Sequence, residues 1–165
     1  MNRIEQFLTM LESERRYSAY TIRSYRHDIY AFLEWLKVDA ENFDTESISR
    51  DSIKDWAIHL FDVKGLKATS VNRHLASLRS LWDWMREMGY TKRDVMRGIS
   101  QFKQPKRLPT FVPDSRMEDV VEELRNDIAS LDPERLRDAL IILLIYTCGL
   151  RLSELVEANQ EDVAA

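Results

Sequence analysis

Residues 69–88 read TSVNRHLASLRSLWDWMREM, and their apolar side chains recur at alternating spacings of four and three residues. This spacing places the apolar side chains on one face of an α-helix, so it predicts a helix of about Thr69 to Met88 with one buried face. Gly89 follows at once, where glycine commonly ends a helix. The predicted buried side chains are Val71, Leu75, Leu78, Trp82 and Met85.

Similar apolar stripes predict further helices on both sides of this one. Ser18 and Ser49 are suited to begin two of them, because a serine hydroxyl accepts a hydrogen bond from a free amide at a helix N-terminus. We find no alternating β-branched run that would indicate a sheet. The fold class is therefore all-α, with four to five helices in one bundle of about 100 residues. The additional helices are expected at about residues 2–14, 18–37, 50–63 and, as a short last one, 94–99.

Three prolines at every fourth position, Pro105, Pro109 and Pro113, predict an extended linker, since proline removes a donor and disfavours helix in its predecessor. We therefore divide the chain into a helical domain at 1–100, a linker at 101–113 and a second part at 114–165. This second part is expected to contain a helix at about 114–129 and another that begins at Asp132-Pro133, an N-cap followed by proline. About 50 residues are too few to bury its apolar helix well, so we expect this second domain to be incomplete.

The second part contains an apolar run, Leu140 to Tyr146, which we expect to be buried because a helix that is apolar on all sides normally is. Gly149 suits the left-handed position that ends such a helix. Arg151 would then lie at a rigid corner, and Glu154, three residues later, could reach its guanidinium. Arginine in that setting suits a phosphate, whereas the alternative is a structural Arg–Glu pair that closes the turn.

Composition excludes several classes of protein. With 44% hydrophobic and 32% charged residues, the chain is typical of globular proteins. The longest apolar run, Ala139 to Tyr146, is too short for a membrane span of about 20 residues, and no leader-like segment opens the chain. The single cysteine fits a reducing cytoplasm, and the lack of paired Cys and His argues against a zinc site. We expect a cytoplasmic protein with neither metal nor cofactor.

Charge is distributed unevenly. Residues 64–107 contain eleven Lys and Arg but only three acidic residues, which gives a local net charge of +8. The rest of the chain has a net charge of −12. A basic middle can bind a polyanion even when the whole chain is acidic. The commoner explanation of such a run is a solvated basic face.

Several segments resemble one family. Tyr146–Leu155 reads YTCGLRLSEL and is similar to the Y-A-T-G-L-R-x-S-E-L of Xer-type tyrosine recombinases, the phage-type integrases, with Cys148 where the family usually has Thr. Gly65–Leu81 resembles the family's G-L-S-x-x-T-I-N-R-H-L-S-A-L-R-S-F. Tyr17–Asp28 resembles S-x-x-T-x-x-x-Y-x-x-D, and Pro105–Pro109 resembles P-K-x-x-x-L-P. The matches span the chain in the family's order.

The resemblance implies a SAM-like core-binding bundle followed by the first helices of a truncated catalytic domain. In this reading Arg151 is the first catalytic arginine, which binds the scissile phosphate, and Glu154 is the acidic residue that supports it. Double-stranded DNA is the implied partner. The residues predicted to contact it are Thr21, Tyr25, Arg73, Arg79, Lys103, Lys106 and Arg107.

These DNA contacts have different physical reasons. Thr21 lies in the first turn of its helix, where free amides attract phosphate. Arg73 and Arg79 point in different directions from their helix, and the three linker cations would follow the backbone. Capping for Thr21 and packing for Tyr25 are alternatives to DNA contact, and His74 is expected to be a packed side chain. Trp82 and Trp84 are expected in the core and at its rim.

The family's reaction is attack of a tyrosine hydroxyl on a DNA phosphate, which needs neither nucleotide nor metal. The resemblance implies that the tyrosine nucleophile follows the arginine motif in the chain, whereas all six tyrosines here precede Arg151. We therefore expect the N-terminal part of a site-specific recombinase, which binds DNA without cleaving it; other recombinase subunits are partners of the full-length protein, and no membrane is involved. Two alternatives stay open. One is an accessory protein that regulates a full-length relative, and the other is a helical module whose basic region meets an acidic protein.

Overall fold

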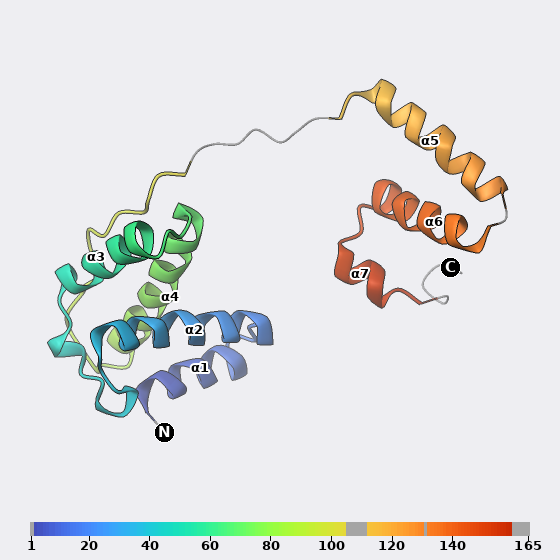
Figure 1. Ribbon diagram of the computed structural model, residues 1–165. Coiled ribbons are helices and arrows are strands. Elements are labelled where there is room, and N and C mark those ends of the chain that lie inside the picture. Colours follow the sequence, from blue (N-terminus) through green and yellow to red (C-terminus); the bar gives the residue numbers. More distant parts are fainter. Residues whose placement is uncertain (1, 105–111, 131, 160–165) are drawn as a thin grey trace. The chain divides into compact units, whose positions relative to one another are not determined.

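The computed structural model describes residues 2–104, 112–130 and 132–159. The chain forms two compact units, Met1–Lys106 and Arg107–Ala165, and each is described by itself (Figure 1). Every regular element in the described residues is a helix, which confirms the all-α class. None of the described helices has both the length and the apolar content needed to cross a membrane. Most of the predicted linker lies outside the described residues.

The first unit is a bundle of four α-helices joined by short turns. Asn2, Ser18 and Ser49 each accept a hydrogen bond from the backbone amide three residues on, so side-chain caps set the starts of three helices. These three starts agree with the sequence prediction to within two residues. The helices are α1 (Arg3–Ser13), α2 (Ala19–Leu36), α3 (Arg50–Ile58) and α4 (Ala68–Glu87), with short turns η1 (Ala40–Asn42) and η2 (Thr45–Ser47).

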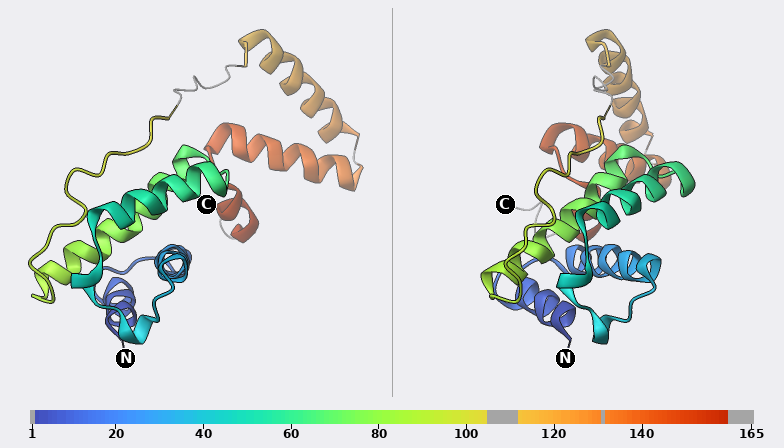
Figure 2. Two further views of the ribbon diagram at one scale, coloured as in Figure 1. Left: turned by 60° about the vertical axis from the view of Figure 1, so that its left-hand side comes forward. Right: turned by 90° about the vertical axis from the view of Figure 1, so that its left-hand side faces the viewer.

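Helix α2 packs against both α1 and α4. Figure 2 shows α4 crossing the α1–α2 pair at a steep angle. All five predicted side chains of α4, from Val71 to Met85, are buried, and so are both Trp82 and Trp84. The largest fully buried side chains come from every helix of the bundle, and they are Ile4, Phe7, Leu8, Leu11, Ile29, Phe32, Ile53, Leu75, Leu78, Leu81, Trp82 and Met85.

Two elements differ from the sequence prediction. The short helix expected at 94–99 is wrong, because the chain forms only turns closed by bonds from Arg97 N–H to Asp94 and from Ile99 N–H to Met96. Gly98 has a left-handed backbone with φ 78°, which stops any continuation. The helix expected at 50–63 is interrupted, since α3 passes into a π-helix, η3 (His59–Val63). Such wide turns often occur at functional sites.

The second unit contains α5 (Asp114–Ala129), α6 (Pro133–Cys148) and α7 (Leu152–Glu157), with α6 packed against the other two. The predicted Asp132 cap and the left-handed Gly149, with φ 64°, are both confirmed. The apolar run is poorly buried, as expected for so short a second part: Leu140 is 50% exposed and Tyr146 is 56% exposed. Within the described residues, α5 and α7 cover only part of α6, so much of its apolar surface faces outward.

Candidate nucleic-acid interface

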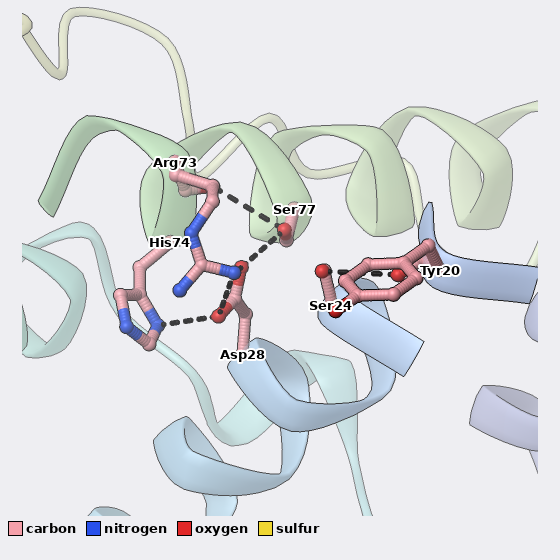
Figure 3. A network of polar contacts seen from close by, with 6 residues as sticks. All are labelled: Tyr20, Ser24, Asp28, Arg73, His74 and Ser77. Atoms are coloured by element: carbon pink, nitrogen blue, oxygen red, sulfur yellow. Dashed lines mark hydrogen bonds and ion pairs between the residues drawn. The ribbon is translucent and has the colours of Figure 1, made fainter. Parts of the chain in front are cut away.

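A buried carboxylate links α2 to α4 (Figure 3). Asp28 of α2 is fully buried, and Nη1 of Arg73 lies 2.9 Å from its Oδ1 and 3.0 Å from its Oδ2. One turn further along α4, the Ser77 hydroxyl donates to Oδ2 at 2.8 Å. Nδ1 of His74 lies 3.2 Å from Oδ1. Asp28 therefore fixes the polar face of α2 against that of α4.

The imidazole of His74 is packed, as the sequence predicted. Its ring meets that of Trp56 edge-on, with centroids 6.1 Å apart. Burial lowers the pKa of His74 below its usual value; Asp28 opposes this shift, whereas Arg73 and His27 add to it. The ring is therefore neutral at neutral pH, and Arg73 supplies the charge that balances Asp28.

Thr21 lies two turns before Asp28, on the same face of α2. Its amide donates to the Ser18 hydroxyl at 3.2 Å, and the two hydroxyls are 2.9 Å apart. Between Thr21 and Asp28, the Ser24 hydroxyl donates to the Tyr20 carbonyl at 3.0 Å. Thr21 thus takes part in the helix cap, which was the alternative to DNA contact, and its contact with DNA stays a prediction.

Tyr25 is half-buried and packs in the bundle. Its ring centroid lies 6.2 Å from that of Phe7 and 6.1 Å from that of Tyr17. In the first turn of the same helix, Tyr20 is 79% exposed, and the guanidinium of Arg23 lies 5.7 Å from the Tyr20 ring centroid. The start of α2 therefore presents an aromatic and cationic surface to solvent.

The two predicted arginines of α4 face different neighbours, as their spacing indicated. The side chain of Arg73 is 47% exposed, so it binds Asp28 and still reaches the surface. Arg79 instead donates from Nη2 to the carbonyl of Ile99 at 3.2 Å. Contact of either arginine with DNA stays a prediction.

Sequence reasoning missed Asn72, although it lies inside a quoted motif. Its Nδ2 donates to the carbonyl of Phe102 at 3.0 Å, and its Oδ1 accepts from the Phe102 amide at 2.8 Å. Because Asn72 precedes Arg73, this pair brings the exposed Lys103 to the same end of α4 as Arg73. Asp28 was missed in the same way. The predicted contacts Lys106 and Arg107 lie outside the described residues.

A cavity of about 410 Å³ opens beside the Asp28 network. The rings of Trp35, Trp56 and His59 line it, together with His27 and His74. Trp56 and His59 are stacked, with centroids 5.8 Å apart. No group of three or more His, Cys, Asp or Glu that could hold a metal ion occurs in the described part of the chain. Glu34 and Lys64 also line the cavity, so it combines aromatic and charged side chains.

In the second unit, Arg151 and Glu154 form the predicted pair. The Arg151 guanidinium donates from Nη1 to Oε1 at 2.8 Å, and its backbone N–H donates to Oε2 at 2.7 Å. Glu154 thus both caps α7 and fixes the rotamer of Arg151. The Arg151 side chain is 82% exposed, so its remaining donors face solvent. The planar guanidinium in that arrangement can bind an anion through two of its oxygens.

The sequence matches the domain family "phage integrase, N-terminal SAM-like domain" over residues 4–89. This stretch is more than half of the chain and holds the whole of α2, α3 and α4. The chain belongs to the phage integrase family. The SAM-like domain therefore contains both motifs that the Asp28 network joins.

Relatives of this integrase-family chain cover nearly its whole length. Tyrosine recombinase XerC of Staphylococcus saprophyticus is 32% identical over an alignment of 168 positions, which covers 99% of this chain and 53% of that protein. Tyrosine recombinase XerD of Listeria monocytogenes is 32% identical over 160 residues, 97% of this chain and 52% of that protein. A crystal structure of XerA recombinase covers 97% of this chain and 50% of its own, with 19% identity and a TM-score of 0.46. The resemblance to Xer-type recombinases is confirmed, and the chain spans about half the length of these two curated relatives.

Proposed function

We propose that this chain is the N-terminal part of a site-specific tyrosine recombinase, which binds duplex DNA with its first unit. The Asp28 network carries this proposal. Asp28 ends one family motif and Arg73 lies in another, 45 residues away, yet they meet in one partly buried ion pair. The polar faces of α2 and α4 therefore form one surface rather than two separate ones. The relatives that cover the chain are tyrosine recombinases.

The charges at the N-terminal end of α4 suit a phosphate backbone. Lys67 is the N-cap of this 20-residue helix, and it is exposed and makes no side-chain cap bond. Amides in the first turn of such a helix attract anions. Lys103 and the exposed part of Arg73 add positive charge at the same end. Phosphate contacts of this kind supply affinity and position the protein without reading sequence.

Arg151 supplies the catalytic part of the proposal. Its guanidinium, held by Glu154, would bind the scissile phosphate and stabilise the negative charge that develops when a tyrosine hydroxyl attacks phosphorus. A phosphotyrosine link would form as the 5′ hydroxyl leaves, so the bond energy is kept for rejoining. Because all six tyrosines precede Arg151, the nucleophile in this proposal comes from outside these 165 residues. The chain alone binds DNA and does not cleave it.

The direct test is a titration of the chain against a pool of random duplexes at two salt concentrations, followed by sequencing of the bound fraction. Specific recombinase-type binding should enrich one sequence or an inverted repeat, and the affinity should fall as salt rises. Recovery that is independent of both salt and sequence would remove DNA binding and favour a protein-interaction module.

A pair of matched variants locates the interface. Lys67→Ala/Lys103→Ala removes two charges from the N-terminal end of α4, whereas Lys92→Ala/Arg97→Ala removes two exposed charges after its C-terminal end. If Lys67 and Lys103 each neutralise one phosphate, their loss should make the slope of log K against log salt concentration shallower by about 1.8. The second variant should leave it unchanged, and equal effects of the two variants would contradict the proposed interface. Arg73 is unsuitable here, because its loss also disturbs Asp28.

A further inference from the structure

After α4 the chain turns back and runs along the helix that it has just left (Figure 2). Two side chains of α4 hold this returning segment by its backbone. Arg79 donates to the carbonyl of Ile99, and Asn72 bonds both the amide and the carbonyl of Phe102. A primary amide that binds both groups of one residue acts like the edge of a β-strand, so it selects an extended backbone.

The spacing of the two contacts is consistent on both chains. Asn72 and Arg79 are seven residues apart, which places them on one face of α4 with a rise of about 10.5 Å between them. Ile99 and Phe102 are three residues apart, and an extended chain of that length spans about 10 Å. The segment therefore lies antiparallel to α4 with its two ends in register with Arg79 and Asn72.

Apolar contacts support the same placement. Ile99 is only 9% exposed, and the ring of Phe102 lies 5.1 Å from that of Phe61 in η3. The Asn72 side chain is itself almost buried, with 8% of its surface exposed. Breaking its two bonds would leave buried polar atoms without partners, so the docked state is strongly favoured.

We infer that Asn72 and Arg79 are positioning residues, which dock residues 99–102 on α4 and so fix the point where the chain leaves the bundle toward residues 107–165. In this role Arg79 acts through the returning segment and not by touching DNA. The purpose of this docking rests on the proposed function. Docking of residues 99–102 makes Lys103 and the linker emerge at the N-terminal end of α4, beside the proposed DNA surface. Release of residues 99–102 would shift that exit by about 10 Å along the helix.

A distance measurement between two spin labels tests the dock without DNA. The labels are placed in a Cys148→Ser background at Glu87→Cys, in the last turn of α4, and at Gln104→Cys, just after the docked segment. Docking predicts one narrow distribution, on the order of 20–30 Å, since the 15 helical residues from Asn72 to Glu87 rise about 22 Å. Asn72→Ala should broaden it severalfold in width.

Hydrogen exchange at the Phe102 amide is a second, independent measurement of the docked state. The Phe102 amide should exchange at least about tenfold faster in Asn72→Ala than in the parent chain, because its acceptor is gone. Arg79→Ala keeps that acceptor and should affect the Phe102 amide less, while releasing Ile99. If Asn72→Ala proves too unstable, Arg79→Ala remains informative, because Arg79 is only partly buried.

The outcomes separate this inference from a purely structural role for Asn72. If Asn72→Ala lowers the free energy of unfolding but leaves the label distribution narrow, the positioning role is overturned. A parent distribution as broad as that of the variant would also overturn it. Failure of the parent chain to bind DNA, with a narrow distribution intact, would instead count against the proposed function alone.

Discussion

At the scale of single residues, Asp28 and Arg73 form the ion pair that joins α2 to α4. The carboxylate has no exposed surface, whereas the Arg73 side chain is about half exposed. Arg73→Ala leaves a buried charge without its cation and should lower the free energy of unfolding by on the order of 3 kcal/mol. Asp28→Asn added to that variant removes the charge and should restore part of the loss. Urea unfolding of the two single variants and the double variant measures this coupling, which we expect to exceed about 1 kcal/mol.

The matched control is Arg97→Ala, which removes an exposed arginine from the turn after α4. Its stability should lie within about 0.5 kcal/mol of the parent. Additive effects of Arg73→Ala and Asp28→Asn would contradict the coupling.

His74 makes stability depend on pH in a defined direction. Burial lowers its pKa in the folded chain, so the unfolded chain takes up a proton first as pH falls below about 6.5. This contribution favours the folded state above that pH, weakens as pH falls and levels off below the folded pKa. We expect the urea midpoint to fall between about pH 7.5 and 5.5, and to fall less in His74→Gln. His27→Gln should reduce the fall less than His74→Gln does, because His27 is exposed and causes only part of the shift in the pKa of His74.

An equal fall in midpoint in the parent and in His74→Gln would show that other groups cause it. Glu5 is not such a group. Although burial raises its pKa, the hydrogen bonds from Arg26 and Tyr30 lower it below the usual value, so Glu5 stays ionised over this range.

Local residue pairs could be predicted from the sequence, and distant ones could not. The Arg151–Glu154 pair follows from a spacing of three residues, which helix geometry converts into contact. The pairs Asp28–Arg73 and Asn72–Phe102 join residues 45 and 30 positions apart. No periodicity relates such positions, because their contact depends on how the helices pack.

At the scale of elements, buried stripes and caps predicted the helices well. Ser18, Ser49 and Asp132 each cap the helix that they were expected to begin. The expected helix at 94–99 was wrong because Gly98 adopts a left-handed backbone, which favours a turn over another helical residue. The π-helix after α3 left no signal in the apolar spacing, since its residues still supply the buried Leu60.

The returning segment was also outside what element-level patterns can show. Residues 99–102 have neither helical nor strand periodicity, so the sequence indicated only a connection there. Their order comes from side chains of α4 and from Phe61, all distant in sequence. Irregular segments of this kind become predictable only when the surface that they lie on is known.

At the scale of the whole molecule, the two units differ in the core that they contain. The first unit buries large apolar side chains from all four of its helices. Among the described residues of the second unit, the buried apolar side chains are Leu124 and Ala139. Apolar burial is the main favourable term in folding, so the stability of this chain should reside mostly in the first unit.

Native-state hydrogen exchange tests this difference. Amides in the middle of α4 should exchange only when the whole first unit unfolds, whereas amides in the middle of α6 should open locally and exchange at least about 100-fold faster. The reason is the exposed surface of α6, where Leu140 and Tyr146 are each about half exposed and gain little from the folded state. Added urea should accelerate exchange in α4 more steeply than in α6, because global unfolding exposes more surface than local opening. Exchange in α6 as slow as in α4, with the same dependence on urea, would contradict two units of unequal stability and would instead require that both unfold together.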